Sequence, residues 1–353
     1  MLSQRQMKEW IPETIELFKS VMASNHAPFP EICIVSDKTM DRIRNSLLAR
    51  TQSQAKLRVE IPAMETLHGP GGDAIIIYQN AFRGAYWDEE SKGRFQHFLW
   101  HELGHFYALN MEDPADNYSR FMDQKPHPDE YEALLGYSFW SEFIAEVIAC
   151  KVTPALEIDW EGYNWYPIRN ELLRLLFGAL NTSGMGINWY DLAFYIAKVT
   201  SDKTVLGFID AAKKGVAKVR NTYNLFSSTE ITFEEAGLDP IGMNDIADEP
   251  LRIIKDLYRY MELQLAEEEY WKVTYEDLET IGAIIHALER TILIAEFKET
   301  MRGIKKNPTM MKLSRFVLIN DKNSVLESIE SVKLEKYTLE YLADAKASER
   351  ENS

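Results

Sequence analysis

FQHFLWHELGHFYAL, residues 95–109, is the stretch that decides how this chain folds. Apolar and aromatic side chains fill most of its positions and leave no broad polar face, which predicts a helix buried inside the protein. Gly104 stands in the middle of this helix, where glycine costs about 1 kcal/mol relative to alanine. We therefore expect a neighbouring element to pack closely against the backbone at that turn.

The same helix carries a pattern typical of a metal site. His101 and His105 are four residues apart and so lie on one face, where two imidazoles can reach the same ion. Glu102 projects about 100° from His101, which suits a general base that contacts a metal-bound water without ligating the metal. An accidental HExxH in a chain of this composition has odds on the order of one in a hundred. The alternative is a pair of buried histidines satisfied by hydrogen bonds alone.

A third ligand is expected on a second apolar helix, YSFWSEFIAEVIAC at 137–150. Catalytic zinc takes three protein ligands and keeps a fourth position for water. Glu142 and Glu146 fall on one face of this helix. We assign Glu142 to the metal and Glu146 to the far nitrogen of a ligand histidine, whose tautomer it would fix. The reverse assignment is the main alternative, and a second one leaves both carboxylates in solvent.

HELGH followed by SEFIAE resembles the zincin metallopeptidases, and among them the gluzincin branch, in which two histidines and a downstream glutamate hold zinc. The resemblance implies one zinc ion per chain on His101, His105 and Glu142. It also implies hydrolysis of a peptide or protein substrate by metal-activated water, with Glu102 as general base. Glu146 stands where many relatives have aspartate. The likeness covers these two helices and a plausible sheet before them.

Three segments before the motif predict a small sheet: EICIVSD at 31–37, AKLRVEIPAM at 55–64 and DAIIIYQNAF at 73–82, with a tight glycine-rich turn between the last two. The resemblance implies that the 73–82 strand lies at the sheet edge and pairs with an extended substrate. The alternative is an ordinary core strand.

The rest of the chain predicts helices. Apolar spacing places them at 6–23, 41–50, 92–110, 129–151, 168–181, 188–199, 203–223, 250–268, 274–302 and 323–345. An acidic stretch with Gly and Pro at 229–250 indicates a boundary. We therefore expect an α+β, predominantly helical protein. A zincin-like domain with a small mixed sheet spans 1–225, and a helical C-terminal domain spans 226–353.

The composition of the chain excludes some classes of binding partner and indicates a compartment. The net charge of −16 argues against nucleic acid, whose binding needs clustered Lys and Arg. Cys33 and Cys150 lack CxxC spacing, which argues against a disulfide framework and suits a reducing cytoplasm. No signal-peptide core opens the sequence, and no run resembles the roughly 18 to 20 apolar residues of a membrane span. We expect a cytoplasmic protein without a membrane partner; oligomeric state is not predicted.

Two other functions stay open at this stage. A zinc-binding homologue without proteolytic activity could regulate rather than cleave, with the 111–128 loop covering its site. A helical interaction protein with a chance motif would act through an exposed apolar face of 250–345. That last interpretation expects His101, His105 and Glu142 to lie far apart and to bind no metal.

Overall fold

The fold is known from a computed structural model. It describes residues 3–22, 29–53, 62–82, 84–110, 131–159, 188–213, 244–265 and 273–289, with isolated positions between 168 and 179. Over these residues the protein is mostly helical and has a small mixed sheet, as expected for the α+β class. The predicted domain boundary at 225 and the predicted helix at 323–345 lie outside the described residues.

The sheet has three strands in the order β1-β3-β2. Their bounds are Glu31–Val35 for β1, Met64–Leu67 for β2 and Ala74–Tyr78 for β3. β1 runs parallel to β3, and β2 runs antiparallel to it. Every residue of β3 is buried, as its uninterrupted apolar sequence AIIIY predicts.

This order corrects one prediction about the strands. The strand expected at the sheet edge, 73–82, contains β3, which lies in the centre and pairs on both sides. A run that is apolar at every position predicts cover on both faces of the strand, and in this sheet β3 also has a neighbouring strand on each side. The strand next to the motif helix is β2. Of the predicted segment 55–64, residues 55–61 lie outside the described residues, and the described strand covers Met64–Leu67.

Within the described residues the helices follow the predicted ones closely, and the predicted ends at 223, 268 and 302 lie outside those residues. The described helices are α1 (Gln4–Met22), α2 (Met40–Thr51), α3 (Glu89–Asn110), α5 (Tyr131–Val152), α7 (Trp189–Ser201), α8 (Lys203–Lys213) and α10 (Asn244–Leu265). A further helix covers 275–289, and a short 3-10 turn, η1, covers Gln79–Phe82. α10 begins before its predicted start at 250. Its first turns lie inside the acidic 229–250 stretch that was predicted to be a domain boundary. Half of the segment predicted at 168–181 lies outside the described residues, and the described positions within it are helical, as predicted.

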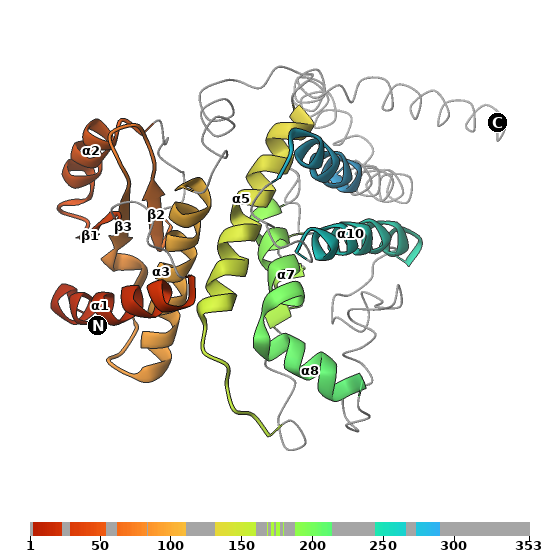
Figure 1. Ribbon diagram of the computed structural model, residues 1–353, viewed down its shortest axis with the longest axis horizontal. Coiled ribbons are helices and arrows are strands. Elements are labelled where there is room, and N and C mark those ends of the chain that lie inside the picture. Colours follow the sequence, from red (N-terminus) through yellow and green to blue (C-terminus); the bar gives the residue numbers. More distant parts are fainter. Residues whose placement is uncertain are drawn as a thin grey trace, which may run out of the picture.

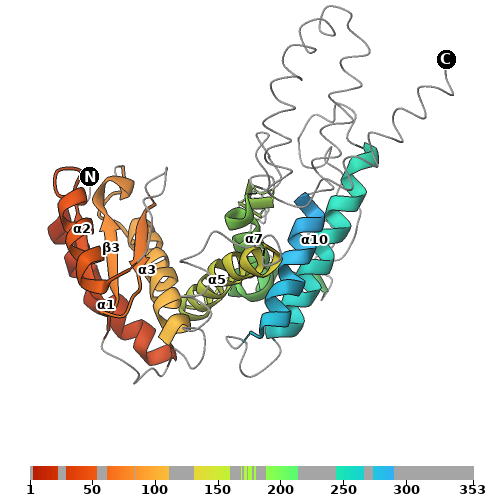
Figure 2. The ribbon, with the colours of Figure 1, turned by 90° about the horizontal axis from the view of Figure 1, so that it is seen from above.

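α3 and α5 lie in the middle of the part of the chain that the structure describes. Figure 1 shows the sheet with α1 and α2 on one side of this pair, and α7 and α10 on the other; Figure 2 shows the same order from above. The buried faces of α3 and α5 join one hydrophobic core that also contains residues of α1 and α7. The Trp100 indole N–H donates to the Thr14 carbonyl of α1 across 3.0 Å, which ties the first helix to α3.

α5 requires one correction about membranes. By length and composition, an 18-residue window of this helix is apolar enough to cross a bilayer, although no such segment was expected. In the structure 83% of that window is buried inside the protein. Packing in the core accounts for the apolar sequence of this helix.

Gly104 marks the closest approach of the two central helices. A β-carbon built at this position would lie 2.8 Å from the carbonyl oxygen of Ala145 and 2.9 Å from its α-carbon. These atoms belong to the backbone of α5 and cannot move aside as a side chain would. The predicted close contact at this turn is therefore confirmed, and its partner is α5.

We expect Gly104→Ala to destabilise the protein by about 1–3 kcal/mol, because overpacking against a backbone outweighs the better helix propensity of alanine. Gly93→Ala is a matched control on the same helix, since a β-carbon there meets nothing within 4 Å. Urea unfolding measures both variants. Gly93→Ala should raise the midpoint slightly, and an equal rise in Gly104→Ala would contradict the expected contact.

Candidate metal centre

Three side chains from the two central helices converge on one point. Nε2 of His101 lies 3.3 Å from Oε2 of Glu142, and Nε2 of His105 lies 3.6 Å from the same oxygen. Zinc bonds of about 2.0–2.1 Å in a tetrahedron hold neighbouring ligand atoms about 3.4 Å apart. Both distances to the shared oxygen are close to that spacing, all three ligand atoms lie within 4.8 Å of one another, and an N, N, O donor set suits a zinc ion.

The site lies in the packed contact between α3 and α5. The side chains of His101, His105 and Glu142 are 10%, 13% and 9% exposed, and the ring of Phe194 from α7 stands edge-on to His101 at 5.3 Å between centroids. Two histidines and a carboxylate are thus largely shielded from solvent. Such a group needs a cation to balance it, whether a proton or a metal ion.

The charges within the trio act strongly on one another. Burial raises the pKa of Glu142, but the facing imidazoles of His105 and His101 outweigh it and hold that pKa well below its usual range. Burial likewise lowers the pKa of His101, but its hydrogen bonds to Glu142 and Glu146 raise that pKa to about 10. The site thus attracts positive charge, and a metal ion that binds there must displace a proton.

Glu146 lies on the opposite side of the His101 ring from Glu142. Its Oε2 is 3.0 Å from Nδ1 of His101, while Nε2 of that ring faces Glu142. Glu142, and not Glu146, is therefore the carboxylate that faces both Nε2 atoms. Glu146 occupies the position expected of a residue that fixes the tautomer of a ligand histidine.

Glu102 is held outside the trio by the edge strand β2. The Thr66 hydroxyl lies 2.7 Å from Oε2 of Glu102 and 3.0 Å from its carbonyl oxygen. The hydroxyl proton can be donated to the carboxylate, which orients it. Sequence reasoning did not single out Thr66, because no fixed spacing connects residue 66 with a helix that begins more than twenty positions later.

Ser141 and Lys198 are further contacts that the sequence analysis missed. The Ser141 hydroxyl is 3.3 Å from Nδ1 of His105, on the side of the ring away from Glu142. The Lys198 ammonium on α7 is 3.4 Å from Oε1 of Glu146. A signal existed for each residue: Ser141 directly precedes Glu142, and Lys198 is a charged residue on the otherwise apolar stretch AFYIAKV.

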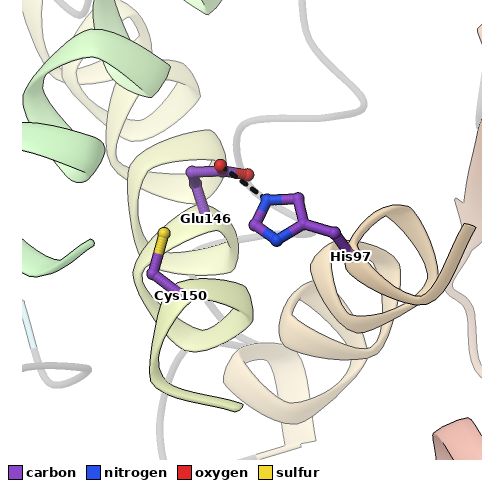
Figure 3. Close-up of side chains that lie close together, drawn as sticks. All are labelled: His97, Glu146 and Cys150. Carbon is purple, nitrogen blue, oxygen red and sulfur yellow. Dashed lines mark hydrogen bonds and ion pairs between the residues drawn. The ribbon is translucent and has the colours of Figure 1, made fainter. Parts of the chain in front are cut away.

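His97 belongs to a second group of potential ligands behind the first. Its Nε2 lies 2.9 Å from Oε1 of Glu146, and Figure 3 shows both side chains with Cys150, which shares α5 with Glu146. The ligand atoms of these three residues lie within 4.8 Å of one another. The side chain of His97 is partly buried and contacts Glu146.

Comparisons of the chain with protein-family models, with curated proteins and with solved structures give no match.

Proposed function

We propose that this chain is a zinc-dependent hydrolase, a metallopeptidase of the zincin type and gluzincin branch, that cleaves peptide bonds. The observation that carries the proposal is the convergence of Nε2 of His101 and Nε2 of His105 on Oε2 of Glu142, at 3.3 and 3.6 Å. The interpretation as a chance motif expects these residues to lie far apart, and their close grouping argues against it.

His101, His105 and Glu142 would hold one zinc ion. Bound there, zinc would supply Lewis acidity, which polarises a scissile carbonyl and lowers the pKa of a bound water to about 7. Glu102, oriented by Thr66, takes the proton of the attacking water and passes it to the leaving amine. Burial of the ligands excludes bulk water from their side of the site.

The resemblance assigned substrate pairing to the 73–82 strand, which contains β3. In this proposal β2 has that role instead. It is an edge strand of the described sheet, and Thr66 connects it directly to Glu102. An extended peptide that pairs with this edge would place its main chain beside the general base, with little dependence on side-chain sequence. The proposed substrate is therefore an extended peptide or protein segment. A cytoplasmic location, supported by the free thiols of Cys33 and Cys150, stays part of the proposal.

The direct test is elemental analysis of the purified full-length protein followed by a peptide-library screen. We expect about one zinc per chain and cleavage that chelation abolishes and zinc restores. Zinc binding without cleavage of any library member would favour the non-proteolytic alternative. A protein that cannot be loaded with zinc would refute the metal site.

Thr66→Val is expected to lower kcat/KM about 10-fold without changing zinc content, because loss of the hydroxyl frees the Glu102 carboxylate to leave its working position. Thr66→Ser is the matched control, since it keeps a hydroxyl and should retain most activity. Steady-state kinetics with a peptide from the screen measures the effect. Full activity in Thr66→Val would mean that Thr66 does not orient the base.

A further inference from the structure

Glu146 is a buried carboxylate with basic partners from two different helices. Its Oε2 contacts Nδ1 of His101, while its Oε1 contacts Nε2 of His97 at 2.9 Å and the Lys198 ammonium at 3.4 Å. Both histidines come from α3, whereas Lys198 comes from α7. An ionised carboxylate that is 4% exposed is strongly destabilising unless a positive charge compensates it.

The compensating positive charge could come from a second metal ion bound by His97, Glu146 and Cys150. The geometry argues against it. The 2.9 Å between His97 and Glu146 is a hydrogen-bond distance and is shorter than the spacing of about 3.4 Å between zinc ligands, which the first trio does show. Burial also raises the pKa of the Cys150 thiol well above its usual range, which makes the loss of its proton to a metal ion costly.

The Lys198 ammonium already occupies the place of a cation beside Glu146. It lies 3.6 Å from Asp202, one turn further along the chain, so Lys198 is held between two carboxylates. Asp202 thus restricts where the ammonium can move. The group behind the metal site is therefore a network of hydrogen bonds and ion pairs that carries its own cation.

We propose that Lys198 is a positioning residue of the metal centre. From α7 it compensates the charge of Glu146 and holds that carboxylate against Nδ1 of His101, which leaves Nε2 of His101 directed at the metal position. The role rests on the zinc site of the proposed function. It makes α7, which contributes no metal ligand from its described side chains, a requirement for tight metal binding.

Lys203 provides a matched control. Its ammonium donates to the carbonyl oxygens of Lys151 and Thr153, at 3.1 and 3.0 Å, and so ties the start of α8 to the C-terminal end of α5. Lys203 thus ties a neighbouring helix to α5, as Lys198 does, but it binds backbone carbonyls and not Glu146. Its loss would loosen the packing without removing the charge beside the carboxylate.

The test is zinc affinity of the full chain, measured by competition with a chelator. Lys198→Met should weaken zinc binding about 10-fold, at the lower end of the 10- to 100-fold range for residues behind metal ligands. Lys198→Arg should restore most of the affinity, and Lys203→Met should leave it unchanged. In a Glu146→Gln background Lys198→Met should add little, because Lys198 acts through Glu146.

Three results would overturn the proposal: wild-type affinity in Lys198→Met, an equal loss in Lys203→Met, or additive effects of the Lys198 and Glu146 substitutions. A cobalt titration could give a fourth result that overturns the proposal. A second bound Co²⁺ with a thiolate absorption band, lost in Cys150→Ser and kept in Cys33→Ser, would make a metal the resident cation. Absence of zinc binding in the wild type would refute the proposed function itself, whereas unchanged affinity in Lys198→Met refutes only the positioning role.

Discussion

Glu102→Gln is expected to lower kcat by about 10²- to 10⁴-fold while the protein keeps its zinc, the range over which a general base contributes to catalysis. Glutamine preserves the size of the side chain and can still accept a hydrogen bond from Thr66, but it cannot take a proton from water. Because Glu102 lies outside the ligand trio, the metal site should stay intact. Kinetics with a peptide substrate, together with elemental analysis of the same sample, measures both quantities.

The control for this substitution is Glu90→Gln, which removes an exposed carboxylate from the first turn of the same helix. It should leave both activity and zinc content unchanged. If Glu102→Gln retained near-wild-type turnover, another group would have to act as the base. If it lost zinc instead, Glu102 would belong to the ligand set, which would contradict the geometry around Glu142.

The sequence predicted the helices of the centre better than the sheet. α3 and α5 are long and apolar on most sides, and such segments have few alternatives to a buried helix. β3 was correctly expected to be a strand, but periodicity describes the two faces of a strand and says nothing about its neighbours. METL, the sequence of β2, is too short and mixed to stand out from a turn.

The candidate site also has one part that the sequence predicts and one part that it does not. A spacing of four residues on one helix suffices to place His101 beside His105, whatever the rest of the fold. Glu142 and Glu146 are also four residues apart, so both face α3, and only the register of the α3–α5 contact decides which one meets Nε2. That register is set at Gly104, where the two backbones touch, and sequence periodicity does not contain it.

Glu142→Ala is therefore expected to have the largest effect on the metal: a loss of zinc affinity of more than about 100-fold, beyond the range seen for residues behind the ligands. His101→Ala should match it, because each removes one of three donors. Glu146→Ala should weaken binding by about 10- to 100-fold, since it leaves the donors in place and removes only the partner of Nδ1. Zinc content after dialysis and chelator competition rank the three variants.

The order of the two glutamate variants is the decisive result. Glu157→Ala removes an exposed carboxylate just beyond α5 and should keep wild-type affinity, which controls for the overall loss of negative charge. If Glu146→Ala lost zinc more completely than Glu142→Ala, the reverse assignment would hold and Glu142 would be the supporting residue. Such a result would require α5 to shift by about one turn against α3, and the contact of Gly104 with the backbone of Ala145 opposes that shift.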